Sequence, residues 1–79
     1  MFYIYILKSE KNGRLYIGQT QDVTKRLLRH NDGLCRSTRL NRPYRLIYSE
    51  NFDNRGDVMI REKYLKSLKN PQAILKLIE

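Results

Sequence analysis

The sequence predicts one small α+β domain over residues 1–79: a three-stranded antiparallel sheet flanked by helices, in the order β-β-α-β-α-α. Two runs rich in tyrosine and isoleucine, residues 2–7 and 15–18, enclose Asn12-Gly13, a dipeptide typical of tight β-hairpin turns. A third run of strand composition occupies residues 44–52. Apolar residues at helical spacing follow the second and third strands, which predicts helices packed on the sheet.

The predicted hairpin brings two tyrosines onto one face. Strand side chains alternate between faces, and a loop of even length pairs odd residues of the first strand with even residues of the second. Tyr5, Tyr16 and Gly18 then share a face. A four-residue loop over residues 10–13 brings Tyr5 within diagonal reach of Tyr16, whereas a two-residue loop separates them along the ladder.

A first helix is predicted for residues 23–30, with Thr20 or Asp22 as its N-cap and Gly33 as a left-handed residue after its end. Its buried stripe is formed by Val23 and Leu27, which are four residues apart. Two ionisable residues, at positions 26 and 30, border this stripe. We expect both to face a cleft.

The second half of the chain starts with a basic loop, residues 34–43, and continues into the third strand, where Leu46 and Tyr48 share a face. A long helix follows, from Asp53 or Asn54 to about residue 69. Its expected apolar face consists of Val58, Ile60, Tyr64, Leu65 and Leu68, with Glu62 just outside it. Asn70 and Pro71 end this helix and start a final one, residues 72–78, whose apolar residues cover the core: Ile74, Leu75 and Ile78.

The charge balance favours an anionic partner. Sixteen basic and eight acidic residues give a net charge of +8, which indicates nucleic acid first, with an acidic membrane surface or a ribosome as alternatives. So short a chain buries a small core, so any site is expected to be a shallow cleft. A single cysteine, Cys35, and the lack of a secretory signal or a long apolar span favour the cytoplasm.

No familiar catalytic motif is present: the sequence lacks a glycine-rich phosphate loop, paired cysteines, HExxH and a serine-nucleophile motif. Its single histidine excludes a multi-histidine metal site. A dispersed set remains: Tyr5, Tyr16, Arg26, His30 and Glu62. Each has an ordinary alternative: core aromatic for the tyrosines, solvated charge for the arginine, helix-dipole contact for the histidine, and an ion pair with Lys66 for the glutamate.

Together these residues supply the parts of a phosphodiesterase, which needs a metal, a cation for the charge of the pentavalent state and a proton acceptor. Arg26 is always charged and suits phosphate geometry. Glu62 offers a hard oxygen ligand to Mg²⁺, which keeps several waters. A tyrosine is a poor base unless a nearby cation or metal stabilises its phenolate. Four further cations are candidates for contact with the nucleic-acid backbone or simply solvated: Arg36, Arg39, Arg42 and Lys66.

The ordered set resembles the GIY-YIG endonuclease superfamily over essentially the whole chain. It consists of Tyr3-Ile4-Tyr5, Tyr16-Ile17-Gly18, Arg26, His30 and Glu62. The small stand-alone bacterial GIY-YIG proteins are the most similar branch: their Thr-Arg…Arg-Pro stretch is similar to residues 38–39 and 42–43, and their Arg-Glu-Lys to residues 61–63. Two positions depart from the family pattern. Tyr3 replaces the glycine of the first motif, and the asparagine that several members carry after the metal glutamate has only Asn70 as a counterpart.

The resemblance implies a role for each residue. Tyr16 is similar to the general base that activates water, and Tyr5 to the partner that shapes the site. Gly18 leaves the backbone room beside the phosphate. Arg26 corresponds to the arginine that stabilises the phosphoryl transition state, and His30 to a residue that orients groups or relays protons. Glu62 is similar to the carboxylate that binds the metal, Mg²⁺ or Mn²⁺, together with waters.

The implied reaction is hydrolysis of one nucleic-acid strand, with DNA favoured over RNA, by in-line attack of water and without a covalent intermediate. Charge holds a protein on the phosphate backbone, but base contacts specify sequence, and this chain has no room for a second DNA-binding domain. We therefore expect low sequence specificity, a preference for a DNA structure, or delivery by a partner protein. The alternative is a basic nucleic-acid-binding module that keeps the nuclease fold with little turnover.

Overall fold

The computed structural model describes residues 1–78. Its elements, in chain order, are β1 (Phe2–Ser9), β2 (Leu15–Thr20), α1 (Val23–Asn31), the 3₁₀ turn η1 (Arg39–Asn41), β3 (Tyr44–Phe52), α2 (Arg55–Ser67) and α3 (Pro71–Ile78). The predicted fold class and element order are confirmed. None of the helices in this range has both the length and the apolar character needed to cross a membrane.

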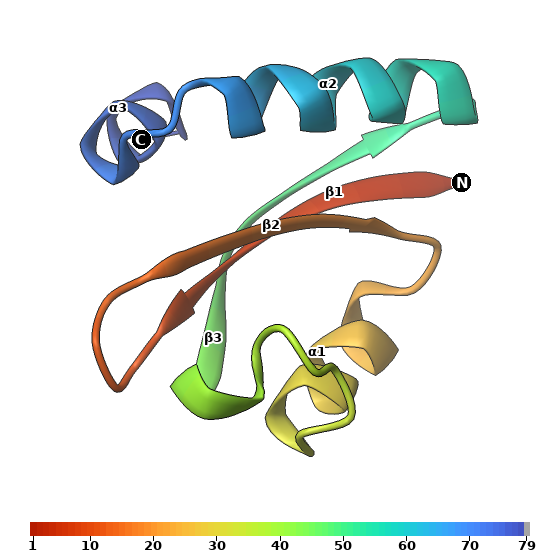
Figure 1. The fold of residues 1–79 in the computed structure, drawn as a ribbon. Helices are drawn as coiled ribbons and strands as arrows, with labels where there is room; N and C mark the ends of the chain where they lie inside the picture. Colours follow the sequence, from red (N-terminus) through yellow and green to blue (C-terminus); the bar gives the residue numbers. More distant parts are fainter. Residues whose placement is uncertain (79) are drawn as a thin grey trace.

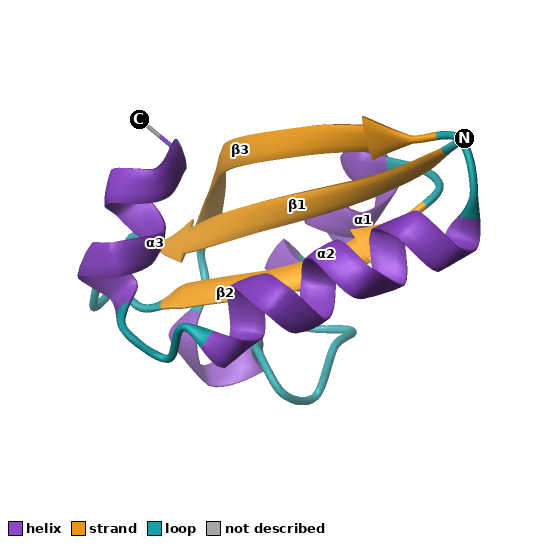
Figure 2. Cartoon of the chain, turned by 90° about the horizontal axis from the view of Figure 1, so that it is seen from above, coloured by secondary structure: helices purple, strands orange, loops and turns teal. Residues whose placement is uncertain are grey.

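The three strands form one antiparallel sheet in the order β2-β1-β3, so the first strand is central and the other two are edges. Helices α2 and α3 lie on one face of the sheet, and α1 lies on the other (Figure 1). Seen from above, α2 runs across the sheet and α3 closes the end near the C-terminus (Figure 2). The sheet is therefore covered on both faces, while the outer edge of β2 stays open.

The hairpin between β1 and β2 has the four-residue loop. Residue Tyr5 pairs with Gly18, and Leu7 pairs with Tyr16. The loop closes through the Gly13 N–H, which donates to the Ser9 carbonyl at 2.9 Å, and Gly13 takes a positive φ of 77°. This register puts Tyr5 and Tyr16 diagonally opposite on the face that α1 covers.

The two faces of β1 enter different clusters. Its even residues join an apolar cluster beneath α2 and α3, which consists of Ile4, Ile6, Ile17, Val58, Leu65 and Ile74. Its odd residues join an aromatic cluster beneath α1, which consists of Tyr5, Leu7 and Tyr44, with Tyr16, Val23 and Leu27 packed against it. The strict alternation of an extended strand produces this division.

The caps expected from the sequence are present. Asp22 Oδ1 accepts the Lys25 N–H at 3.0 Å and starts α1, while Thr20 instead accepts the N–H of Asp22. Asn54 Oδ1 accepts the N–H of the third residue of α2. At the start of α3, Asn70 Oδ1 accepts the Gln72 N–H at 2.9 Å. The helix starts are thus set by short polar side chains next to each boundary.

The expected alternation along β3 is wrong. The pairing of β1 with β3 shifts by one residue between Ile6 and Leu7, so Leu46 lies opposite Leu7 while Tyr48 lies opposite Ile6. Leu46 and Tyr48 are therefore on opposite faces, and Ile47 packs with Tyr48 against the apolar cluster. An extra residue in one strand reverses the faces beyond it, and no local pattern in the sequence marks the position.

The apolar face expected for α2 is also partly wrong. Val58 and Leu65, seven residues apart, are fully buried, and Leu68 packs beside them. Ile60 is 70% exposed and Tyr64 is 47% exposed. At 100° per residue these two positions lie far from the direction of Val58, so the true stripe is narrower than the composition suggested.

Candidate active site

A histidine surrounded by three tyrosines lies beneath α1. The ring centroid of His30 is 4.9 Å from that of Tyr16, 5.8 Å from Tyr5 and 6.1 Å from Tyr44. The Tyr5 and Tyr16 centroids are 6.2 Å apart. Three strands and one helix contribute one ring each, so the cluster forms only when the sheet and α1 are assembled.

His30 is not at the rim of a cleft, which corrects the expectation from the sequence. Only 1% of it is exposed. It follows Val23 and Leu27 at intervals of four and three residues, which places it on the buried stripe of α1 itself. Arg26, by contrast, is half-buried and does reach an open hollow.

A chain of hydrogen bonds fixes the histidine. The Tyr5 hydroxyl is 2.9 Å from His30 Nε2, and His30 Nδ1 is 2.7 Å from the Thr38 hydroxyl, which donates to the Cys35 carbonyl at 3.3 Å. Since the Thr38 hydrogen is directed to that carbonyl, Thr38 accepts from Nδ1–H and Nε2 accepts from Tyr5. Every group in the chain is then satisfied with His30 neutral.

The environment keeps both partners uncharged. Burial, and then the neighbouring Tyr16, raise the pKa of the Tyr5 phenol above its ordinary value. Burial, with added repulsion from Arg26 and Arg29, lowers the pKa of His30. Tyr5 therefore keeps its proton at neutral pH and acts as a hydrogen-bond donor. Of the two motif tyrosines, only half-buried Tyr16 is accessible to water.

Glycine is required at position 18 by the ring of its partner across the hairpin. A Cβ on Gly18 would lie 2.5 Å from the Tyr5 hydroxyl oxygen and 2.7 Å from Cζ, far inside van der Waals contact. That ring is buried and bonded to His30, so it has little freedom to move aside. The space beside Gly18 thus belongs to the Tyr5 phenol.

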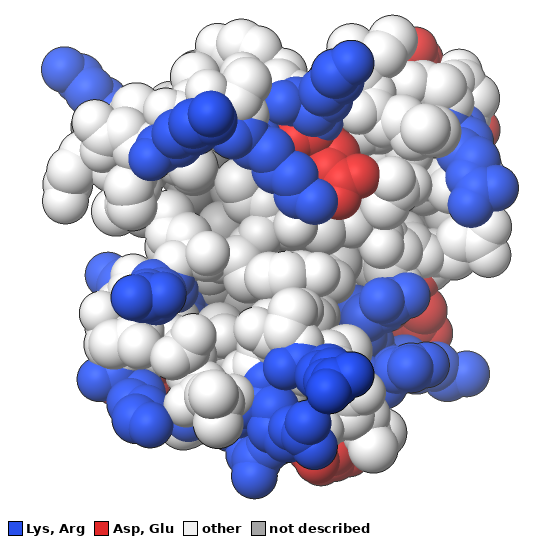
Figure 3. Space-filling view, viewed as in Figure 1, with Lys and Arg blue, Asp and Glu red and all other residues white. Residues whose placement is uncertain are grey.

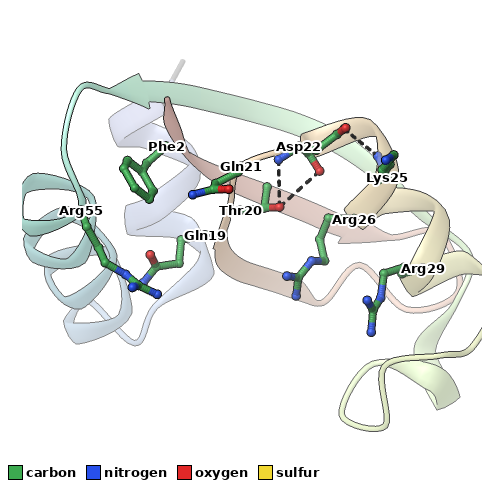
Figure 4. Close-up of a pocket in the computed structure, with 9 residues that line it drawn as sticks. All are labelled: Phe2, Gln19, Thr20, Gln21, Asp22, Lys25, Arg26, Arg29 and Arg55. Atoms are coloured by element: carbon green, nitrogen blue, oxygen red, sulfur yellow. Dashed lines mark hydrogen bonds between the residues drawn. The ribbon is translucent and has the colours of Figure 1, made fainter.

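Arg26 opens into a shallow hollow of about 520 Å³. Figure 4 shows Arg26 and Arg29 projecting from α1 toward one side of it, with Arg55 entering from α2 beside Gln19. The other lining residues come from the start of β1, the end of β2, the connection that follows it and the first turn of α1: Phe2, Thr20, Gln21, Asp22 and Lys25. Of this lining, only Arg26 is among the residues that the sequence identified.

Glu62 belongs to α2, on the opposite face of the sheet from His30. Its Oε1 accepts a hydrogen bond from Gln19 Nε2 at 2.7 Å, and its Oε2 is 2.9 Å from Lys66 Nζ. The ion pair with Lys66 that the sequence offered as an alternative is confirmed. Gln19 was not predicted as a partner of Glu62. The alternation of β2 could have indicated it, because that alternation puts Gln19 on the same face as Leu15 and Ile17, toward α2.

The partners of Glu62 connect it to both sides of β2. Gln19 lines the hollow that contains Arg26. Lys66 lines a second hollow of about 380 Å³ that also contains Tyr16. Glu62 therefore lies between the two hollows, and the candidate site is arranged around the open edge of β2. Figure 3 shows basic side chains above and below an uncharged waist on this side of the molecule.

The metal expected at Glu62 can be held there only through one carboxylate and water molecules. Within residues 1–78, no three side chains of histidine, cysteine, aspartate or glutamate gather into a cluster. Mg²⁺ commonly takes one or two carboxylates and keeps several waters, and a single glutamate whose two partners line open hollows suits that mode. A closed cage made only of protein ligands is not available here.

The remaining candidates lie elsewhere. Arg36, Arg39 and Arg42 are exposed, and the side chains of Arg39 and Arg42 approach Gly33 beyond the C-terminal end of α1. The hollow with Arg26 is at the other end of that helix. Asn70 caps α3, so its side chain is engaged at the turn where the sequence placed it.

Comparison with known proteins finds one family model and several small bacterial relatives. The model of the GIY-YIG catalytic domain matches residues 1–75. A UPF0213 protein of Staphylococcus saprophyticus is 42% identical over 77 residues, covering 96% of this chain and 92% of the relative. A UPF0213 protein of Clostridium perfringens is 40% identical over 75 residues, covering 94% and 80%. A UPF0213 protein of Streptococcus pneumoniae is 39% identical over 71 residues, covering 89% and 71%.

The search of solved structures finds no match to this chain. The family match and the small bacterial relatives confirm the resemblance carried by the two tyrosine motifs, and the fold is of the nuclease type. This chain belongs to the GIY-YIG family.

Proposed function

We propose that this protein is a divalent-metal-dependent endonuclease that hydrolyses phosphodiester bonds of nucleic acid, DNA in preference to RNA. One observation carries the proposal: the two hydrogen-bonding partners of Glu62 line the hollows that contain Arg26 and Tyr16. A carboxylate, a permanent cation and an accessible phenol are thereby available to one phosphate at the edge of β2. These are the groups that phosphodiester hydrolysis needs.

Tyr16 is the proton acceptor in this proposal. It is half-buried and lines an open hollow, so this residue is in reach of solvent. Tyr5 is buried, and its raised pKa keeps it protonated, so it cannot accept a proton at neutral pH. Tyr5 and His30 instead fix the orientation of the Tyr16 ring, because both of their rings lie beside it.

Arg26 stabilises the negative charge that accumulates on the reacting phosphate, because its guanidinium stays protonated and offers several donors in one plane. Glu62 and water hold the metal, which when bound supplies Lewis-acid polarisation of a phosphate oxygen. Gln19 orients the Glu62 carboxylate through Oε1. Lys66 forms an ion pair with the other carboxylate oxygen, Oε2, and adds a positive charge near the substrate.

Specificity for sequence is expected to be low. The cations around β2 are arranged to meet phosphates, and phosphate contacts position a nucleic acid without reading its bases. Discrimination therefore comes from the shape of the DNA or from a partner protein. Affinity should fall steeply as salt increases, since displaced counterions drive such binding.

A specific observation favours the second candidate, a nucleic-acid-binding module with little turnover. Both oxygens of Glu62 are already bonded, one of them to an ammonium group, and a metal must compete with that ion pair. The net charge of +8 serves binding equally well with or without catalysis.

The test is cleavage of supercoiled, linear and branched DNA and of RNA in the presence of Mg²⁺ or Mn²⁺. We expect the wild type to cut DNA. Tyr16→Phe, Arg26→Ala and Glu62→Gln should each lower the rate by roughly 100-fold or more under saturating protein, as losses of a base or a charge-stabilising group do.

Matched control variants remove the same groups elsewhere on the surface. Tyr64→Phe, Arg45→Ala and Glu10→Gln alter exposed side chains outside the site and should cleave like the wild type. Cleavage that survives all three site substitutions would show that the assignment is wrong. Salt-sensitive binding without metal-dependent cleavage of any substrate would favour the binding module.

A further inference from the structure

The hollow beside Arg26 carries more positive charge than the reaction at one phosphate requires. Four cations line it, of which three were not identified from the sequence: Lys25, Arg29 and Arg55. The first two belong to α1, and the third is the first residue of α2. Figure 4 shows Arg29 on the α1 side of the hollow and Arg55 on the α2 side, with Gln19 beside Arg55.

These cations are not neutralised by the protein. Among residues 1–78, ion pairs join Arg61 to Glu50 and Lys66 to Glu62, and no carboxylate pairs with a cation of the hollow. The single acidic residue of the lining, Asp22, is engaged as the N-cap of α1. Four positive charges that face one hollow repel one another, and a bound anion relieves that repulsion.

Two of the cations are in places where helix formation disfavours them. Lys25 lies in the first turn of α1, and Arg55 begins α2. The positive end of the helix dipole is there, so a basic side chain destabilises the helix instead of stabilising it. The hollow thus lies at the N-terminal ends of two helices, and both ends attract an anion.

The hollow also connects with the residues that carry the proposed reaction. Arg26 is part of its lining, and Gln19 extends from it to the Glu62 carboxylate. An anion held by Lys25, Arg29 and Arg55 is therefore the neighbour of the phosphate at Arg26. In a nucleic acid, the neighbour of one backbone phosphate is the next one along the same strand.

We infer that this hollow is a phosphate-binding subsite, in which Lys25, Arg29 and Arg55 hold a backbone phosphate of the DNA strand adjacent to the phosphate that reacts. The inference rests on the proposed function for its choice of ligand. It directs the strand along the edge of β2, from the hollow that contains Tyr16 to the gap between the starts of α1 and α2.

Arg55 is the residue that tests the subsite, because it acts from α2 and is not among the proposed catalytic groups. Binding of a fluorescent DNA oligonucleotide is measured in EDTA over a range of salt concentrations. Arg55→Ala should weaken binding and make the slope of log K against log salt shallower by about 0.9 for duplex or about 0.7 for single-stranded DNA. Arg45→Ala is the control: it removes an exposed arginine from β3, so its net charge equals that of Arg55→Ala. It should keep the wild-type slope.

A second measurement locates the contact on the strand. Oligonucleotides that carry one uncharged methylphosphonate linkage at successive positions are compared for the wild type and Arg55→Ala. The wild type should bind more weakly when the linkage next to the cleaved bond is neutral. At that position the affinity of Arg55→Ala should not change, whereas at the other positions the two proteins should respond alike.

The outcomes separate this inference from the proposed function. Equal slopes for Arg55→Ala, Arg45→Ala and wild type, in a protein that cleaves DNA, overturn the subsite and leave the nuclease assignment standing. If one neutral linkage weakens binding by the wild type but not by Arg55→Ala, and neither protein ever cleaves DNA, the subsite is supported and the nuclease assignment is overturned. Wild-type protein that binds no DNA overturns both.

Discussion

The two faces of the sheet differ in what they bury. Beneath α2 and α3, the apolar cluster consists of aliphatic side chains with no polar atom among them. Beneath α1, the buried groups include the Tyr5 hydroxyl, the His30 ring and the Thr38 hydroxyl, joined in one hydrogen-bonded chain. Within residues 1–78, every buried side-chain nitrogen and oxygen has a partner. One face buries aliphatic side chains alone, and the other also buries a chain of hydrogen-bonded polar groups.

Strand β1 serves both faces. Ile4 and Ile6 belong to the apolar cluster, while Tyr5 and Leu7 belong to the aromatic cluster. A change on one side of this strand is therefore expected to act mainly on stability, and a change on the other to act on the geometry of the site. The following variants test that division.

The largest effect on stability is expected from Ile6→Ala, in the apolar cluster. Ile6 is fully buried on the central strand, and its truncation leaves a cavity that should lower the free energy of unfolding by about 2–5 kcal/mol. Urea unfolding followed by circular dichroism measures it. Leu40→Ala, at a position that is 80% exposed, is the control and should change stability by less than about 0.5 kcal/mol.

A smaller effect is expected from Thr38→Val in the hydrogen-bonded chain. Valine keeps the shape but leaves His30 Nδ1–H without an acceptor, which should cost about 1–3 kcal/mol of stability. Nitrogen NMR of the imidazole should also show a changed tautomer, because Nδ1 loses the group that fixes its hydrogen.

Thr38→Ser is the matched variant, since it retains the hydroxyl. It should preserve the tautomer and the Nδ1 hydrogen bond seen for wild type. If valine and serine give the same imidazole spectrum, Thr38 does not orient His30, and its role is packing alone.

The smallest effect on stability is expected from a change of pH, which removes no side chain from either face. His30 has a lowered pKa when folded, so the unfolded chain binds more protons below about 6.5, and stability should decrease as pH falls from there toward the folded pKa. Tyr5 has a raised pKa, so the unfolded chain releases its proton near 10, and stability should decrease as pH rises above that value.

Urea midpoints measured from pH 5 to 11 follow both losses. Tyr5→Phe should make the alkaline decrease smaller, leaving the part due to Tyr44 and Tyr48, whose pKa values are also raised. Tyr64→Phe, at an exposed position, should leave the decrease unchanged. An alkaline decrease that is identical in the two variants would contradict the assignment to Tyr5.

Much of the fold was predictable because its signals are local. Asn12-Gly13 and the alternation of β1 and β2 predicted the hairpin and the face that its tyrosines share. The observed register corresponds to the longer of the two loop lengths that the sequence allowed. Short polar residues predicted the helix starts. The bulge in β3 and the narrow stripe of α2 were not predicted, because both depend on how one element meets another.

The candidate site was predictable in its membership and only partly in its arrangement. The motif spacing identified Tyr5, Tyr16, Arg26, His30 and Glu62. The structure groups the first four near one face of the sheet, with Glu62 on the other face and bonded to Gln19 of the edge strand β2. Their catalytic roles stay predictions. Gln19 and Arg55 were not singled out, since a glutamine and an arginine carry no motif of their own. Thr38 lies in the Thr-Arg stretch that carries part of the resemblance, but nothing in the sequence linked it to His30.

By itself, the sequence determined the order of the elements, the two-sided character of β1, the excess of positive charge and the family motifs, because each of these is written in neighbouring residues. Only the tertiary structure decided that His30 is buried and neutral, that Glu62 reaches the site through Gln19, and that cations of α1 and α2 share a hollow. Those features arise from contacts between residues far apart in the chain, whose distances follow from how the helices pack on the sheet.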